Sequence, residues 1–168
     1  GNASAIHREG QDAARALAEA RTETAQFFDV HADEIVFTSG ATESIALALF
    51  GTIQSWKQTH PGRVPHLIVS AIEHAAVLES AQALRQQGAL LTVVPVDEHG
   101  FVDPVQVAHA ITHDTVIISI MMTNNEIGTI QPIEAIAKEI RSWKKRERHV
   151  QRDEPQTADD RFPLLHTD

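Results

Sequence analysis

The segment "VIISIMMTNNEIGTIQP", residues 116–132, decides the fold. It opens with a β-branched apolar run that is typical of a buried strand. Two asparagines, a glutamate and a glycine follow, and a helically spaced apolar pattern starts at Pro132. A strand, a polar loop and a helix in this order are the repeating unit of an open α/β sheet, which binds ligands beyond the carboxyl ends of its strands. Asn124 and Asn125 therefore indicate either a ligand contact or an ordinary turn that leads into the helix.

The same alternation of strand and helix extends along the rest of the chain. Short apolar runs rich in β-branched residues predict strands, and amphipathic stretches predict helices. The strands are expected at residues 34–38, 66–71, 89–96, 115–121 and 162–168. The helices are expected at residues 13–28, 42–57, 75–87, 103–111 and 132–146. This order predicts an α/β fold of three layers, in which a mostly parallel sheet is flanked by helices on both faces.

Length and composition exclude several classes of protein. The chain has 168 residues, 42% of them apolar, which suits one domain with a substantial core. Its net charge of −9 argues against a nucleic-acid partner, because binding a phosphate backbone needs a basic surface. No segment reaches the roughly 20 apolar residues of a membrane span, so no membrane partner is expected. Cysteine is absent, which excludes disulfides and thiolate metal sites. No metal site is expected, and the cytoplasm is the expected location.

Two further stretches bear on domain organisation. Residues 144–161, "KKRERHVQRDEPQTADDR", are charged, interrupted by proline and nearly free of apolar side chains. Such a composition predicts an exposed, flexible insertion. The chain begins "GNASAIH", without an initiator methionine, and stops at "FPLLHTD", where a strand has just ended in polar residues. We therefore expect a fragment of a longer protein.

The segment "TSGATES", residues 38–44, joins a predicted strand to a predicted helix. A helix N-terminus offers N–H groups and a partial positive charge, which together bind phosphate. Ala41 and Thr42 would present their N–H groups, and the Thr42 hydroxyl could add a hydrogen bond. The alternative is an ordinary helix cap. The segment is neither a Walker loop nor a GxGxxG motif.

Polar residues also follow two other predicted strands. His74, in "IEHAAV" at residues 72–77, could stack on a planar ring or transfer protons, or could simply begin a helix. Asp168, in the terminal "HTD", could pair with a protonated ring nitrogen, or could cap a turn or helix. A phosphate site, a ring-side histidine, an amide and a carboxylate at one sheet edge suit a phosphorylated heteroaromatic ring. Pyridoxal phosphate is such a molecule.

Six motifs appear together and in a fixed order: "GNASAIH", "EIVFTSGATES", "IEHAAV", "GFVDP", "MMTNNEIGTIQPI" and "HTD". As a set they resemble the cysteine desulfurases of the class V aminotransferase group, which are fold-type I pyridoxal phosphate enzymes. The resemblance covers nearly the whole chain except residues 144–161. It implies that residues 1–168 are part of the cofactor-binding large domain of a longer, homodimeric protein.

The resemblance implies a role for each candidate residue. Ala41 and Thr42 would bind the phosphate of pyridoxal phosphate. His74 would stack on the pyridine ring and assist proton transfer, as a catalytic residue. Asn125 would bind near the ring oxygen and the carboxylate of the substrate. Asp168 would pair with the pyridinium nitrogen and keep it protonated. Asn124 and Glu126, which also match the motif, are expected to shape the turn.

The implied reaction converts L-cysteine to L-alanine and leaves a persulfide on the enzyme, which a sulfur-acceptor or scaffold protein takes up for iron–sulfur or thio-cofactor assembly. In the family, the lysine that binds the cofactor covalently and the cysteine that takes the sulfur lie downstream of the residue matched by Asp168. This piece alone is therefore expected to bind cofactor weakly and to be inactive. The alternatives are another class V enzyme, either an aminotransferase or a selenocysteine lyase, and an inactive truncated remnant. A nucleotide-binding α/β domain is disfavoured because its glycine-rich motifs are missing.

Overall fold

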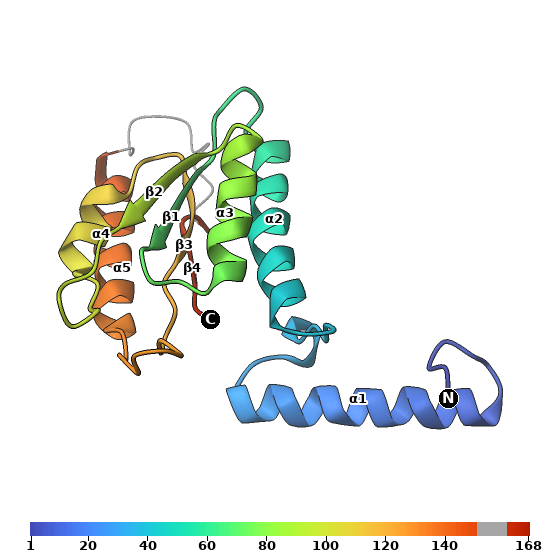
Figure 1. Cartoon of the computed structure of the whole chain (residues 1–168). Coiled ribbons are helices and arrows are strands. Elements are labelled where there is room, and N and C mark those ends of the chain that lie inside the picture. Colours follow the sequence, from blue (N-terminus) through green and yellow to red (C-terminus); the bar gives the residue numbers. More distant parts are fainter. Residues whose placement is uncertain (151–160) are drawn as a thin grey trace. The chain divides into compact units, whose positions relative to one another are not determined.

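The computed structural model describes residues 1–150 and 161–168 and divides the chain into two compact units, Gly1–Ser39 and Gly40–Asp168. The larger unit is a parallel sheet between two layers of helices (Figure 1). This arrangement confirms the predicted three-layer α/β fold. The fold follows from the alternation of short apolar strands with amphipathic helices, since each helix must cover one apolar face of the sheet.

The sheet has four parallel strands in the order β2-β1-β3-β4. Their bounds are His66–Ser70 for β1, Leu90–Val94 for β2, Thr115–Ser119 for β3 and Leu164–His166 for β4. All four lie within predicted strands. The two central strands, β1 and β3, are buried at every position, as expected for strands covered on both faces.

The helices of the larger unit are α2 (Ala41–Thr59), α3 (Ala75–Gln86), α4 (Pro104–Ala110) and α5 (Ile133–Val150). Helices α2 and α3 cover one face of the sheet, and α4 and α5 cover the other (Figure 1). All four were predicted. Asp103 caps α4 by accepting a hydrogen bond of 2.9 Å from the Val105 N–H. Just after α3, Gly88 has φ +90°. This is the left-handed conformation in which helices commonly end.

Successive side chains of β1 point to opposite faces of the sheet, and the core accordingly forms two clusters. Leu67 and Val69 pack with α2 and α3, whereas Ile68 packs with the cluster under α4 and α5. Helix α2 contributes an apolar stripe at helical spacing: Ile45, Leu49, Ile53 and Trp56. Each fully buried side chain of this size contributes about 1.5–3 kcal/mol. The two clusters hold the strands in place and so fix where each strand ends.

The smaller unit contains α1 (Arg8–Phe28) and a short 3-10 helix, η1 (Ala32–Glu34). Helix α1 starts five residues before the predicted boundary, because the His7 side chain caps it by accepting from the Gly10 N–H. It ends as predicted at Asp29, which adopts a left-handed conformation at φ 54°. The early start was missed because histidine is an uncommon cap.

The strand predicted at residues 34–38 is wrong. Glu34 belongs to η1, and residues 35–38 pair with no strand in the part of the chain that the structure describes. Val36 is 65% exposed and Phe37 is 46% exposed. A β-branched run becomes a strand only when a neighbouring backbone pairs with it, and here the Ile35 carbonyl accepts from the Arg21 guanidinium instead.

Helix α5 continues to Val150, four residues beyond the predicted end. The first residues of the charged segment 144–161 are therefore helical. Lys144 Nζ also donates to the Arg161 carbonyl at 2.8 Å, which joins the two ends of that segment. Residues 151–160 lie outside the described part of the chain, so a flexible insertion there stays a prediction.

Candidate functional site

Three neighbouring strands end at one edge of the sheet, and each is followed by polar residues. Glu73 and His74 follow β1, the segment 121–131 follows β3, and Asp168 follows β4. Past the last paired residues of β3 and β4, the Met122 N–H donates to the Asp168 carbonyl at 3.0 Å. Asp168 therefore lies beside the start of the loop that carries Asn125. This edge brings together three of the predicted site residues.

Glu73 lies at the centre of this edge and is only 6% exposed. Its carboxylate accepts hydrogen bonds from the Ser70 hydroxyl, from the Met121 N–H at 2.8 Å and from the Ser119 hydroxyl at 3.2 Å. Burial raises the pKa of Glu73 above its ordinary value, although these hydrogen bonds oppose the rise. Glu73 thus joins the end of β1 to the end of β3.

The Ser119 hydroxyl also lies 2.8 Å from His166 Nδ1, on the neighbouring strand β4. Burial lowers the pKa of His166, and the negative charge of Asp168 opposes that change. Hydrogen bonds therefore run from Glu73 through Ser119 to His166, two residues before Asp168. Sequence analysis did not single out Glu73 or His166 as site residues. The one available signal was that each sits beside a candidate residue at a strand end.

His74 occupies the N-cap of α3, where its Nδ1 accepts from the Ala76 N–H at 3.1 Å. The helix-start alternative for this residue is therefore correct. The cap also restrains the ring, which is exposed at the sheet edge. Because Nδ1 accepts, the neutral ring carries its proton on Nε2. Stacking of His74 on a ligand ring stays a prediction.

The two asparagines of the opening motif differ in burial. Asn124 is 8% exposed, and its Oδ1 accepts from the Glu126 N–H at 2.9 Å and the Ile127 N–H at 3.0 Å. Its Nδ2 donates to the Ile72 carbonyl at 3.0 Å. Asn124 therefore shapes the turn, as predicted, and binds it to the loop before His74. Asn125 is exposed, and its role as a ligand contact stays a prediction.

The Asn125 loop is also attached to the turn between β2 and α4. The buried Gln131 donates to the Gly100 carbonyl at 2.6 Å and accepts from the Val102 N–H at 2.9 Å. Thr129 donates to the His99 carbonyl at 2.8 Å. Gly100 sits at φ +82°, and a Cβ there would lie 2.6 Å from Ile127 Cδ1. These contacts fix the end of the loop before α5, as Asn124 fixes its start.

The predicted phosphate residues lie in the first turn of α2. Gly40 is the N-cap, so Thr42 does not cap the helix. Helix α2 runs antiparallel to the strand that follows it and so begins at the edge where the strands end (Figure 1). Ala41 and Thr42 are exposed, and a Cβ on Gly40 would meet nothing within 4 Å. The exposed first turn of α2 and the exposed Asp168 carboxylate fit the phosphate and the ring nitrogen of pyridoxal phosphate. Binding by these residues stays a prediction.

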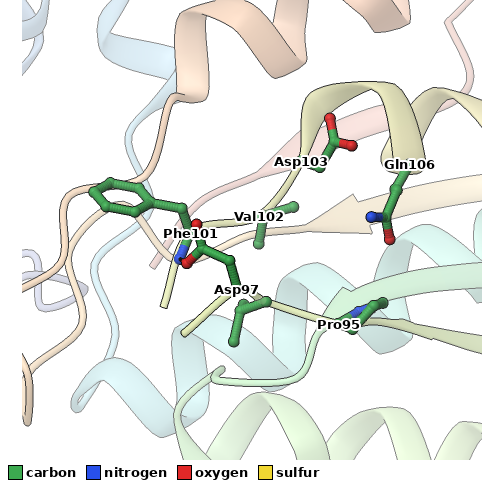
Figure 2. A pocket seen from close by; sticks show the side chains of 7 residues that line it. Pro95, Asp97, Phe101, Val102, Asp103 and Gln106 are labelled. Carbon is green, nitrogen blue, oxygen red and sulfur yellow. Dashed lines mark hydrogen bonds between the residues drawn. The ribbon is translucent and has the colours of Figure 1, made fainter. Parts of the chain in front are cut away.

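A hollow of about 230 Å³ lies beside α4, and none of the predicted site residues lines it (Figure 2). Asp97 in its wall accepts from the N–H groups of His99 at 2.9 Å and Phe101 at 2.8 Å, which lowers the pKa of that carboxyl. Asp97 therefore organises a turn. Among the described residues, no three His, Asp or Glu side chains are placed to hold a metal ion. No helix in the same part of the chain is long and apolar enough to cross a membrane.

The fold and the site define an α/β domain whose polar residues gather at the carboxyl edge of a parallel sheet, the edge where such sheets bind ligands. The chain belongs to the class-V aminotransferase family, whose family model matches residues 1–156. This confirms the family that the six motifs indicated.

Relatives within the family carry more specific names. The cysteine desulfurase IscS of Dictyoglomus turgidum is 44% identical over 138 residues, which is 82% of this chain and 34% of the relative. A mitosomal cysteine desulfurase of Trachipleistophora hominis is 42% identical over 135 residues, which is 80% of this chain and 30% of the relative. The solved structure of a NifS-like protein is 33% identical, with a TM-score of 0.83, over 100% of this chain and 41% of that one. This chain spans about a third of the length of the curated relatives it matches.

Proposed function

We propose that this chain forms part of the cofactor domain of a pyridoxal phosphate-dependent cysteine desulfurase. The whole protein would convert L-cysteine to L-alanine and pass the sulfur, as a persulfide, to an acceptor or scaffold protein for iron–sulfur or thio-cofactor assembly. The observation that carries the proposal is the convergence of the strand ends that bear His74, Asn125 and Asp168, which hydrogen bonds hold in one arrangement. The names of the relatives support the same reaction.

The chain's own residues have distinct tasks in this proposal. Asp168 holds a proton on the pyridine nitrogen, because a carboxylate beside it favours the charged form. His74, restrained by its cap, covers one face of the ring and can move a proton with its exposed nitrogen. Asn125 orients the carboxylate of the substrate. Pyridoxal phosphate, when bound, supplies an electron sink for the charge that develops at Cα.

The first turn of α2 holds the phosphate in this proposal. The N–H groups of Ala41 and Thr42 and the Thr42 hydroxyl are suitable donors, and the partial positive charge at the helix end adds to the attraction. Glu43 lies in the same turn and would oppose the phosphate charge. The phosphate therefore depends on directed hydrogen bonds at the helix end more than on net charge.

The location and assembly of the whole protein are also proposals. The cytoplasm suits a cysteine-free chain, but one relative is named mitosomal, so an organelle is the competing location. A homodimer follows from the family resemblance. The present chain alone, which spans about a third of its relatives, is proposed to be inactive and to bind the cofactor weakly.

The test uses the full-length protein that carries this chain. L-cysteine and a thiol reductant should give sulfide and alanine in equal amounts, and the protein should show the visible absorption of bound pyridoxal phosphate. Asp168→Ala should abolish turnover and weaken cofactor binding, because the ring nitrogen loses its counter-ion. Unchanged turnover and absorption in that variant would refute the assigned role. Selenide release from selenocysteine without sulfide release from cysteine would instead indicate a selenocysteine lyase.

A further inference from the structure

At the edge where the candidate site lies, the buried carboxylate of Glu73 has no part in the proposed chemistry. It accepts three hydrogen bonds, and their donors lie at the ends of two strands: Ser70 on β1, with Ser119 and the Met121 N–H on or just after β3. A buried carboxylate is costly unless such donors satisfy it. Retaining one where an apolar side chain would fill the same space suggests a task beyond packing.

The donors and acceptors along these hydrogen bonds determine which nitrogen of His166 carries the proton. The Ser119 hydroxyl has one proton and two neighbours, Glu73 Oε2 at 3.2 Å and His166 Nδ1 at 2.8 Å. Ser119 donates this proton to Glu73, whose ionised carboxylate can only accept. Ser119 then accepts from His166, which places the imidazole proton on Nδ1 and leaves Nε2 without one.

We propose that Glu73 is a positioning residue that holds His166, through Ser119, in its Nδ1–H tautomer and so fixes the strand end that presents Asp168. The tautomer assignment rests on the hydrogen bonds alone. The consequence for Asp168 rests on the proposed function.

Backbone hydrogen bonds connect Glu73 and His166 to the position of Asp168. The Ile120 N–H donates to the His166 carbonyl at 3.0 Å, and the Met122 N–H donates to the Asp168 carbonyl at 3.0 Å. The Met121 N–H, between these two donors, points instead to Glu73. Glu73 therefore fixes the segment to which the end of β4 is attached, and it directly precedes His74 in the chain. One carboxylate sets the spacing between His74 and Asp168.

The tautomer also decides which nitrogen of the His166 ring carries the hydrogen-bond donor. The carboxylate of Asp168 is close enough to His166 to influence its titration. In the Nδ1–H tautomer this donor stays within the sheet, on the Ser119 hydroxyl at 2.8 Å. In the Nε2–H tautomer the donor would no longer face Ser119.

Glu73→Gln tests the proposal with little change in shape. An amide nitrogen in place of Oε2 donates to Ser119, so Ser119 must donate to His166 Nδ1, and the imidazole proton moves to Nε2. The measurement is ¹⁵N NMR of the histidine rings in the full-length protein without cofactor, with the His166 signal assigned from its loss in His166→Asn. We expect Nδ1–H in the wild type and Nε2–H in Glu73→Gln. A wild-type Nε2–H tautomer, or an unchanged tautomer in the folded variant, would overturn the proposal.

Two further variants keep the test decisive. Ser119→Ala removes the link while leaving Glu73 in place, and should give a mixture of both tautomers. An unchanged single tautomer in this variant also counts against the proposal. Thr92→Val removes a hydrogen bond to His66 at the other end of the sheet and should leave the His166 signal as in the wild type.

Cofactor affinity separates this proposal from the proposed function. Glu73→Gln should weaken pyridoxal phosphate binding on the order of tenfold relative to Thr92→Val, as substitutions behind a binding residue often do. Equal affinities would refute the positioning role. If the wild-type protein binds no pyridoxal phosphate, the proposed function fails, and the tautomer measurement alone decides whether Glu73 controls His166.

Discussion

Among the described residues, each end of the sheet has one buried titratable side chain, and the two differ in where their hydrogen bonds lead. At the amino end, His66 is 4% exposed and bonds to the hydroxyls of Thr115 and Thr92, each at 2.8 Å. These contacts join β1 to its two neighbours and stay within the sheet. At the carboxyl end, the contacts of Glu73 extend through Ser119 to His166 and toward the exposed Asp168.

The comparison shows that similar buried groups can serve stability alone or stability together with a site. Both side chains satisfy the rule that buried polar groups are hydrogen-bonded. His66 holds three strands together at an end where none of the predicted site residues lies. Glu73 holds strand ends at the edge where ligands bind in such sheets. Substitutions at the two ends should therefore have similar effects on folding and different effects on binding.

The largest effect is expected from Glu73→Leu. The substitution leaves the Ser70 hydroxyl and the Met121 N–H without their acceptor, whereas Ser119 can still donate to His166, and each unsatisfied buried group costs about 1–3 kcal/mol. We expect a loss of about 3 kcal/mol in the free energy of unfolding, measured by urea denaturation, and loss of pyridoxal phosphate binding. Glu73→Gln is the matched control and should recover most of the stability. A loss below about 1 kcal/mol would show that Glu73 is dispensable for the sheet.

Thr115→Val removes hydrogen bonds at the amino end of the sheet. His66 Nδ1 loses its partner at 2.8 Å and keeps only the Thr112 hydroxyl at 3.5 Å, and the Thr112 N–H, which donates to Thr115 at 2.7 Å, loses its acceptor. We expect a loss of about 2 kcal/mol in the same denaturation measurement and unchanged cofactor affinity in the full-length protein. Weaker cofactor binding in Thr115→Val would contradict the division of roles between the two ends.

The pH dependence of the free energy of unfolding gives a smaller effect that also distinguishes the two ends. Burial lowers the pKa of His66 from 6.5, so the folded state binds fewer protons than the unfolded state between the lowered pKa and 6.5. Stability should therefore fall as pH decreases through this window, by up to about 1.4 kcal/mol per pH unit for His66. Burial lowers the pKa of His166 too, and its contribution has the same sign.

His66→Gln isolates this contribution. In urea denaturation, the variant should lose less stability than the wild type when the pH is lowered below 6.5. The raised pKa of Glu73 acts in the opposite direction, because its folded state binds the proton more tightly and loses stability as pH rises above 4.5. Equal acid sensitivity in the variant and the wild type would remove His66 as a source of the effect.

The smallest effect is expected from Thr129→Val. Its hydroxyl donates to the His99 carbonyl in an exposed contact, so the loss should be below about 0.5 kcal/mol. Gln131 keeps its two buried hydrogen bonds in this variant, and the Asn125 loop should remain attached. A larger loss in urea denaturation would mean that the loop depends on its exposed contact and not on Gln131.

The layered fold could be predicted because each strand and helix of the larger unit carries its own apolar periodicity. The segment at 34–38 has a strand-like composition as well, but whether such a run pairs depends on a neighbour that sequence order does not reveal. Helix α5 was predicted to end at Arg146 because charged residues follow, yet a polar helix can extend beyond the packed surface.

The candidate site could be predicted only in part. His74, Asn125 and Asp168 follow strands, and parallel strands end at one edge, so their meeting could be inferred. Glu73 and His166 were missed because their roles depend on strand register. Ser119 pairs with His166 across β3 and β4, although 47 positions separate them in the chain. The role of Asn124 in the turn was expected from the family resemblance, and its burial and hydrogen bonds confirm it.

The Ser119 hydroxyl, which contacts both Glu73 and His166, has a consequence for how the protein can evolve. Loss of Ser119 removes the hydroxyl that joins Glu73 to His166, so the effect of a change at either residue depends on whether Ser119 is present. Their substitutions should therefore be strongly non-additive. The three positions are expected to be inherited as one unit, and a lineage that alters one of them should alter the others soon afterwards.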